Sequence, residues 1–417
     1  MTSLSIRAPR ASAALRILVV TTLQQAGLTT IRFGLPVLAP FWREALGLSL
    51  TQVGVLLGAF DLGALLLFLP LGLLADRWGE RVVLTAGALY TAGMAAAVAG
   101  AHSFAALALL LGFAGLGYGS GQTAGAKAVA AAFGAHGRGT AMGIRQSGLP
   151  LGGMVAALLV PALAGAFGWR AGLFGAAAFC GLTGLLCGAG LRNGGGAGTY
   201  ADGTRGDAWP PPGGALVARV RRILADAGIR RTSIVATLLV IGQFCYQGYL
   251  ALYMVDRFGW SKHAAAALLL AVHGGGVAGR LGWGAISDRV LSGRRTPALT
   301  WCAALCAVFP LALIALPRPV PVPLAAAVAC AGGLLLLGWN GLYSTLIMEE
   351  AGAHETGLAM GISMTMLYGA TFVTPPVFGW LVERTSYAVG WAALIAALAA
   401  GYAVSRAVPE PRSGAAG

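Results

Sequence analysis

The sequence predicts an all-α membrane protein of twelve transmembrane helices, arranged as two six-helix bundles. Of its 417 residues, 57% are hydrophobic and only 10% are charged, and the mean hydropathy is +0.77. A soluble domain could not bury that much apolar surface. The apolar residues also fall into runs of about 20 with few charges, the length at which a helix crosses roughly 30 Å of hydrocarbon. Lipid is therefore the expected solvent for most of the chain.

The twelve expected spans divide into two sets of six. The first set covers residues 14–42, 49–73, 82–101, 104–131, 139–165 and 169–190, and the second covers 231–255, 263–286, 297–316, 320–347, 357–381 and 386–406. No small-residue cleavage site follows the first run, so we expect it to remain as a span and not to be removed as a signal peptide.

A polar stretch separates the two sets. Residues 193–214 are rich in Gly and Pro, a composition typical of a linker. A short basic amphipathic segment at 215–226 follows and is expected to lie on the membrane surface. We therefore predict an N-terminal bundle at 1–192, a cytoplasmic linker at 193–229 and a C-terminal bundle at 230–417.

The basic residues predict the orientation of the chain. The net charge is +14, but the basic side chains neither form one patch nor alternate with exposed aromatic residues, which argues against nucleic acid as a partner. Eighteen of them fall on the side that holds the termini and the linker, and six fall in the opposite loops. Because basic loops stay in the cytoplasm, we expect a multi-pass protein of the cytoplasmic membrane with both termini cytoplasmic.

Several classes of chemistry are disfavoured by the sequence. No nucleophile with a neighbouring base, metal-ligand set or phosphate-binding loop stands out, so we expect neither enzyme activity nor a cofactor. The cysteines all lie in apolar runs without metal-ligand spacing and are expected to act as small hydrophobic residues: Cys180, Cys187, Cys245, Cys302, Cys306 and Cys330.

Two sequence echoes indicate an internal repeat. The loop after the second span reads Gly72-Leu-Leu-Ala-Asp76-Arg77-Trp-Gly-Glu-Arg81, and the loop after the eighth reads Gly284-Ala-Ile-Ser-Asp288-Arg289. The start of the fifth span, at 139–144, matches residues 357–362 at the start of the eleventh. Two independent echoes in the same order indicate that the second half repeats the first.

The first loop resembles the cytoplasmic signature of the major facilitator superfamily, G-x-L-A-D-R-x-G-R-R, although Glu80 stands where the family has a basic residue. The twelve-span plan agrees with that family over nearly the whole chain. The resemblance implies the major facilitator fold, a solute site near the midplane between the halves, and alternating access by rocking of one half against the other. It also implies that the loop residues control the conformational state and do not bind solute: Gly72, Asp76, Arg77, Arg81, Gly284, Asp288 and Arg289.

Ionisable side chains within the spans are candidate functional groups, because each costs several kcal/mol in hydrocarbon unless it is paired or hydrated. Arg32 shares a helical face with Gln25 and Thr29, which favours a cavity position, although it could also snorkel to the outer interface. Arg145 lies near the start of the fifth span. The sequence is compatible with a role in the cytoplasmic gate and equally with a role in the solute pathway. Lys127 ends the fourth span, where snorkelling is the simpler explanation.

Arg280 is the main candidate ligand for a carboxylate, because its planar guanidinium can bind two oxygens at once. Glycines before it on the same helix allow a partner helix or a solute to approach closely. Its position shortly before the second loop signature resembles that of an arginine in monocarboxylate and oxalate carriers of the superfamily. A structural pairing near the cytoplasmic gate is the alternative.

Two groups are candidates for proton coupling. Asp61 is the only acid deep within a span, so it should either have a cationic partner such as Arg32 or hold a proton. His273 can titrate near neutral pH, although a hydrogen-bonded packing histidine is equally compatible with its position. The sequence does not indicate whether these two side chains lie close together.

Uncharged polar side chains at helical spacing complete the expected cavity. In the family, the first, fourth, seventh and tenth helices line the cavity, and polar stripes occur on three of these helices in this chain. The stripes on the seventh and tenth helices alternatively serve as hydrogen bonds between helices. They comprise Gln243, Tyr246 and Gln247 on the seventh helix, and Asn340, Tyr343 and Ser344 on the tenth.

Four basic side chains within the spans against one acid predict a cavity that attracts anions. We therefore expect proton-coupled transport of a small organic anion, a carboxylate, by a chain that functions as a monomer. A drug/proton antiporter is the main alternative, but it would need more acidic groups, and the fourth-helix arginine motif of such antiporters is missing. A membrane receptor with the same fold, which binds without transport, is a further alternative.

Overall fold

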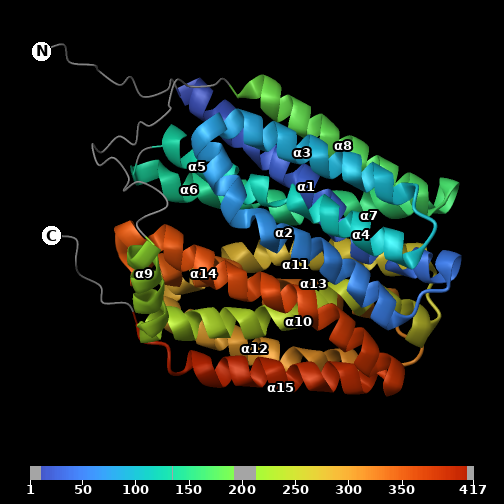
Figure 1. The fold of residues 1–417 in the computed structure, drawn as a ribbon. Helices are drawn as coiled ribbons and strands as arrows, with labels where there is room; N and C mark the ends of the chain where they lie inside the picture. Colours follow the sequence, from blue (N-terminus) through green and yellow to red (C-terminus); the bar gives the residue numbers. More distant parts are fainter. Residues whose placement is uncertain (1–10, 134, 192–212, 411–417) are drawn as a thin grey trace, which may run out of the picture.

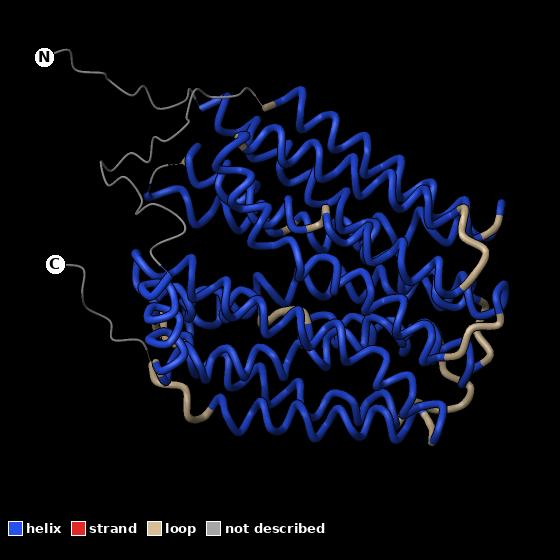
Figure 2. Tube along the Cα trace, in the orientation of Figure 1, coloured by secondary structure: helices blue, strands red, loops and turns tan. Residues whose placement is uncertain are grey.

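The computed structural model describes residues 11–133, 135–191 and 213–410, and within these ranges the chain is helical, with no strand. The helices and their short connections are shown in Figure 2. Residues 193–212 of the predicted linker lie outside the described residues, and the remainder forms α9 and the start of α10.

The first half of the chain forms eight helices. They are α1 (Ala11–Leu46), α2 (Leu50–Trp78), α3 (Glu80–Ala99), α4 (Phe104–Leu116), α5 (Gly119–Ala132), α6 (Ala135–Gln146), α7 (Gly148–Phe167) and α8 (Trp169–Gly190). The second half forms seven α-helices and one π-helical turn. They are α9 (Gly213–Ala225), α10 (Ala227–Phe258), α11 (Lys262–Ala285), η1 (Ile286–Val290), α12 (Arg295–Ile314), α13 (Val322–Leu336), α14 (Asn340–Arg384) and α15 (Tyr387–Ser405).

Eleven helical segments of the described chain are long and apolar enough to cross a membrane. They coincide with the eleven spans predicted after the first. Helix α1, which corresponds to the first predicted span, has 36 residues but is not among the eleven, because polar residues such as Gln24, Gln25 and Arg32 interrupt its apolar sequence. Its polar residues are buried: Gln24 and Gln25 are fully inaccessible and Arg32 is 6% exposed.

Several predicted spans are interrupted in the structure. The span expected at 104–131 is divided into α4 and α5, and the span expected at 139–165 is divided into α6 and α7 at Ser147. Conversely, two predicted spans are joined in one helix. Helix α14 contains the end of the tenth predicted span and the whole of the eleventh, and it is kinked at Gly352. Gly352 has φ of +67°, a left-handed conformation that glycine adopts without strain.

The two halves of the chain occupy separate regions of the molecule. In Figure 1, α1 to α8 lie above α10 to α15, and both described ends of the chain lie on the left, the side on which α9 also lies. Helix α2 packs against α14, and α7 packs against α11, so these two pairs form the main interface between the halves. Helix α9 runs across the ends of the other helices and contacts α10 and α14.

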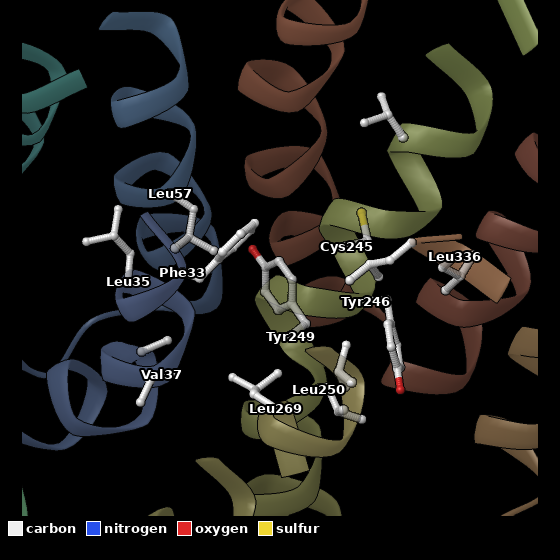
Figure 3. Close-up of a cluster of buried hydrophobic side chains, with 14 of the residues drawn as sticks. Phe33, Leu35, Val37, Leu57, Cys245, Tyr246, Tyr249, Leu250, Leu269 and Leu336 are labelled. Carbon is white, nitrogen blue, oxygen red and sulfur yellow. The ribbon is translucent and has the colours of Figure 1, made fainter. Parts of the chain in front are cut away.

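Apolar side chains fill the space between the halves at the level of Tyr249. Figure 3 shows Leu57 of the first half beside Tyr249 of α10, with Leu35 farther from it. The Tyr249 hydroxyl lies 3.0 Å from the Leu50 carbonyl oxygen and 2.6 Å from that of Pro375. One buried side chain of the second half therefore joins α10, α14 and the start of α2.

Glycines allow α11 and α13 to approach to backbone contact. A Cβ at Gly275 would lie 2.0 Å from the Cys330 carbonyl oxygen, and one at Gly279 would lie 2.2 Å from that of Leu334. The partner that the glycines of this segment accommodate is thus a helix, as expected for small residues at helix interfaces in membranes.

We predict that Gly275→Ala lowers the stability of the protein, because the added methyl group cannot fit without separating α11 from α13. Gly274→Ala is the matched control, since a Cβ there has no neighbour within 4 Å and alanine favours helix formation by about 1 kcal/mol over glycine. Thermal unfolding in detergent should show a lower midpoint for Gly275→Ala and an equal or higher one for Gly274→Ala. Equal midpoints for the two variants would contradict the close approach.

Candidate functional site

Arg32 and Asp61 form a buried ion pair between α1 and α2. The Arg32 Nε donates to the Asp61 Oδ1 over 2.8 Å, and the two side chains are only 6% and 4% exposed. The predicted partner of Asp61 is therefore confirmed. Because the two charges cancel, Arg32 does not add to the net positive charge of the interior while the pair is intact.

Aromatic rings surround the Arg32 guanidinium. Its Cζ lies 4.3 Å from the centre of the Phe244 ring, 5.4 Å from those of Tyr118 and Tyr368, and 5.6 Å from that of Phe33. Each of these faces can attract the cation through its negative π-surface. Rings from both halves of the chain thus enclose the ion pair.

A small cavity adjoins this ion pair. It has a volume of about 20 Å³ and is lined by both charged groups, by Phe244 and Gln247 of α10 and by Pro375 of α14. A space of that size holds about one water molecule. The centre of the molecule is therefore closed to a larger solute in this conformation.

Arg145 is almost completely buried, at 1% exposure, and points into the first half. Its Nη1 donates to the Gly121 carbonyl oxygen at 2.9 Å and to the Gln25 Oε1 at 3.2 Å. Its Nη2 donates to the Gln122 carbonyl oxygen at 3.4 Å. Among the described residues no carboxylate lies within ion-pair distance of Arg145, so its charge is held by amide oxygens alone.

Arg280 of α11 is likewise bound by backbone carbonyls. Its Nη1 donates to the Gln146 oxygen at 3.2 Å, across the interface between the halves, and its Nε donates to the Leu337 oxygen at 3.4 Å. Both acceptors lie at helix interruptions, one at the end of α6 and one after α13. Within the described chain, Arg280 too has no carboxylate at ion-pair distance.

The sequence explains why the Gln146 carbonyl is free to accept this bond. In an uninterrupted helix it would accept from the backbone N–H four residues later, but that residue is Pro150, which has none. A buried carbonyl without a partner is costly, so the guanidinium from the other half satisfies it.

A hydrogen-bonded network connects Arg280 with the polar stripes of α10 and α14. Asn340 Nδ2 donates to the Leu337 carbonyl oxygen at 3.1 Å and to the Gln243 Oε1 at 3.2 Å. Gln243 in turn donates to the Gln247 Oε1 at 3.4 Å, and Gln247 lines the cavity beside Arg32. The structure therefore brings four predicted site residues into one path that leads to the ion pair.

Two other predicted residues make separate contacts in the second half. The Tyr246 hydroxyl donates to the Ala329 carbonyl oxygen at 3.1 Å, and the Tyr343 hydroxyl donates to the Ser363 Oγ at 2.7 Å. In Figure 3 the hydroxyl of Tyr246 points in the opposite direction from that of Tyr249 on the same helix. Direct contact of a solute with Tyr246 or Tyr343 would require these bonds to break.

His273 lies in the interface between the halves and is 2% exposed. Its ring centre is 4.8 Å from that of Phe33, and a Cβ at Gly153 of α7 would lie within 2.4 Å of its ring atoms. Its Nδ1 has no hydrogen-bond partner. No hydrogen bond joins His273 to Asp61, whose charged partner is Arg32.

Lys127 is paired and does not add to the unbalanced charge. Its Nζ lies 3.3 Å from the Glu80 Oε1, with both side chains about 30% exposed. Glu80, the acidic residue in the first loop signature, thus has a basic partner on α5.

The loop residues expected to control the conformational state lie at the ends of helices. Arg81 Nε donates to the Gly188 carbonyl oxygen at 2.7 Å, and Arg295 forms an ion pair with Asp288. Arg77 and Arg289 are exposed and Gly284 is half-buried. The burial of Gly72 and the surroundings of the Asp76 side chain lie outside the described part of the structure.

Sequence reasoning missed the rings that surround Arg32. Tyr118 is fully buried, its hydroxyl has no hydrogen-bond partner, and its ring centre lies 5.4 Å from the Arg32 Cζ. Tyr118 directly follows Gly117, between α4 and α5, so a polar aromatic residue at a helix interruption was the available signal.

Comparison with known proteins gives a consistent result. Residues 21–375 match the model of the Major Facilitator Superfamily. An uncharacterised MFS-type transporter of Mycobacterium tuberculosis is 29% identical over 86% of this chain and 77% of its own length. The hexuronate transporter of Bacillus subtilis is 31% identical over 33% of each chain, and a probable L-galactonate transporter of Escherichia coli is 33% identical over 32% of this chain and 29% of its own.

The fold also matches a solved structure. A bacterial homologue of the human lysosomal transporter Spinster superposes with a TM-score of 0.78 over 96% of this chain and 97% of its own, at 16% sequence identity. At that identity the comparison concerns the fold alone.

We predict that Asp61→Asn lowers the free energy of unfolding by about 3–5 kcal/mol, because it leaves the Arg32 charge buried without its partner. The double variant Arg32→Gln/Asp61→Asn should recover much of that loss, since no charge is then left unpaired. Chemical unfolding of the single and double variants in detergent measures the coupling. Strictly additive effects would show that the pair contributes nothing.

Proposed function

The chain belongs to the Major Facilitator Superfamily, and from this premise we propose that it moves a small organic anion, a carboxylate, across the cytoplasmic membrane together with protons. It is a transporter and not an enzyme. The solute would be bound between the two halves, and alternating access would expose the site to each side of the membrane in turn.

The proposal rests on Arg280, a cation at the interface of the halves that is held only by carbonyl oxygens. After Arg32 is cancelled by Asp61 and Lys127 by Glu80, the interior cations without a carboxylate are Arg145 and Arg280. Amide oxygens stabilise a guanidinium less than a carboxylate does. An anionic solute that replaced the Gln146 carbonyl on Arg280 would supply that stronger partner.

The proposed solute site extends from Arg280 to the ion pair. Asn340, Gln243 and Gln247 would bind polar groups of the solute, and Phe244 and Tyr118 would contact its apolar part. Arg145, which is buried within the first half, would contribute its positive charge from behind Gln25. The partial similarity to transporters named for hexuronate and L-galactonate agrees with a hydroxylated carboxylate as the solute.

Proton coupling is proposed to act through the Arg32–Asp61 pair. A proton on Asp61 would remove the charge that holds Arg32, and the freed guanidinium could then bind the solute carboxylate. A proton and an anion would thus enter together with no net charge. His273 is the second candidate, since its unpartnered Nδ1 lies in the same interface.

We also propose the topology that the basic residues predict. Helix α1 would be the twelfth span, the bundles would comprise 1–192 and 230–417, and both termini would be cytoplasmic. Helix α9, tied to α14 by ion pairs from Arg219 and Arg222 to Glu355, would lie along the cytoplasmic surface. The loop residues would control the conformational state, and one chain would suffice for transport.

The deciding experiment is uptake into proteoliposomes with an imposed pH gradient, using glucuronate, gluconate, lactate, oxalate and malate beside cationic dyes. Uptake of a carboxylate driven by the gradient is the expected result. Extrusion of dyes without movement of any carboxylate would identify a drug/proton antiporter, and binding without flux would identify a receptor.

We predict that Arg280→Gln raises KM for the transported anion on the order of ten-fold to a hundred-fold, the amount that a lost charge-assisted hydrogen bond accounts for. Arg221→Gln is the matched control, because Arg221 is exposed on α9. Initial rates in proteoliposomes measure both. An unchanged KM for Arg280→Gln would remove Arg280 from the site.

We predict that Asp61→Asn abolishes stimulation of uptake by a pH gradient but preserves exchange of the anion across the membrane. The amide imitates the protonated acid, so Arg32 remains free to bind solute but no proton can be carried. Counterflow of labelled anion, with and without the gradient, separates the two activities. Uptake that still responds to the gradient would direct attention to His273.

A further inference from the structure

A second cavity, large enough for a small solute, lies at the end of the molecule opposite the termini. Its volume is about 490 Å³, within the range of ligand pockets and far above the 20 Å³ beside Arg32. Its lining comes from the end of α1, the end of α10 and the start of α11, so both halves contribute. With both termini cytoplasmic, this cavity opens to the outside.

Two ion pairs across the halves form part of the cavity wall. Arg43 Nη1 lies 2.5 Å from the Asp256 Oδ2, and Lys262 pairs with Glu44. Asp256 also accepts a hydrogen bond from the Tyr387 hydroxyl at 2.7 Å. It therefore keeps one hydrogen-bond partner if the ion pair with Arg43 breaks. Glu44 is different, because Lys262 is its only partner among the described residues and its side chain is 67% exposed.

Lys262 is positioned to exchange its carboxylate partner. Its Nζ lies 5.2 Å from the centre of the Phe41 ring, so an aromatic face holds the ammonium group at the cavity wall. An exposed ion pair contributes little to stability, and a carboxylate from solution could replace Glu44 at small cost. Trp260 and Leu252 line the same cavity and offer apolar contact.

We propose that this cavity is an outer docking site for the carboxylate of the solute, with Lys262 as its ligand and Glu44 as the group that it displaces. Displacement removes one of the bonds that join the halves at this end. Binding of an anion therefore occupies this cavity and also favours separation of the two halves at this end. The inference rests on the proposed anion transport, and it adds a site distinct from Arg280.

A matched pair of variants separates docking from a purely mechanical bond. Glu44→Gln and Lys262→Gln delete the same ion pair, so a bond that only closes the outer end predicts equal effects. Docking predicts opposite effects on KM for external glucuronate: a several-fold decrease for Glu44→Gln, which frees Lys262, and at least a five-fold increase for Lys262→Gln. Lys262→Arg should restore the native value. A change of KM in the same direction in both Gln variants, or in neither, would overturn the proposal.

A third variant controls for loss of a bond between the halves elsewhere. Glu383 accepts hydrogen bonds from the Thr51 backbone N–H, at 3.1 Å, and from the Thr51 hydroxyl. Glu383 does not line the cavity. Glu383→Gln should therefore alter the maximal rate and leave KM unchanged. A KM shift like that of Lys262→Gln would show that any weakening of this end produces the effect and would overturn docking.

Docking can also be measured without transport. Leu48 lines the cavity and is 7% exposed, so Leu48→Cys reports occupancy through labelling by a membrane-impermeant maleimide. Cys330→Ser removes the one native cysteine that is exposed. Acids of the panel should slow labelling at least three-fold, and Lys262→Gln should abolish that protection. Protection without uptake would retain the docking site and refute transport, whereas uptake without protection by any acid would refute docking alone.

Discussion

The cost of burying charge in a membrane protein governs the arrangement of the interior. The buried Arg32 charge is stabilised by the carboxylate of Asp61 and by four aromatic rings. The Arg280 charge is stabilised by carbonyl oxygens that the interrupted helices leave without their usual donors. Pro150 is what frees one of these carbonyls. The helix interruptions and the buried cations therefore depend on each other: a continuous helix would offer Arg280 no acceptor, and a neutral side chain would leave the carbonyl unsatisfied.

The internal repeat corresponds to the interface between the halves. One echo relates Gly72 on α2 to Gly284 on α11, and the other relates the segments that lead into α7 and the second part of α14. The structure pairs α2 with α14 and α7 with α11, so each interface pair joins an element of one echo to an element of the other. Glycines allow close contact there: a Cβ at Gly58 would lie 2.4 Å from the Phe372 carbonyl oxygen. Each duplicated helix thus meets the copy of the other repeat across the molecule, and not its own counterpart.

The sequence predicted the helical segments well because burial in lipid imposes a long apolar run on each one. It also offered the Arg32–Asp61 pair as one of two possibilities, since a lone acid in a span needs either a cation or a proton. It could not show that Gln243, Gln247 and Asn340 join Arg280 in one network while Tyr246 and Tyr343 bond elsewhere, because the side chains of one helical stripe diverge according to what each neighbouring helix offers. The rings around Arg32 were missed for the same reason: Tyr118, Phe244 and Tyr368 come from three separate segments of the chain.

The bonds that join the halves differ along the interface in a way suited to alternating access. At the end opposite the termini they are exposed ion pairs such as Lys262–Glu44, which water and solutes can replace at little cost. Deeper in, the half-buried Arg280 side chain donates to a carbonyl oxygen, and the loss of that bond without a substitute leaves the donor and the acceptor atoms without a partner. An anion can replace the acceptor in both places and, being charged, binds either cation more strongly than a neutral oxygen does. A bound anion would therefore weaken the exposed ion pairs first and the Arg280 bond second. Its negative charge would set the order in which the contacts between the halves break.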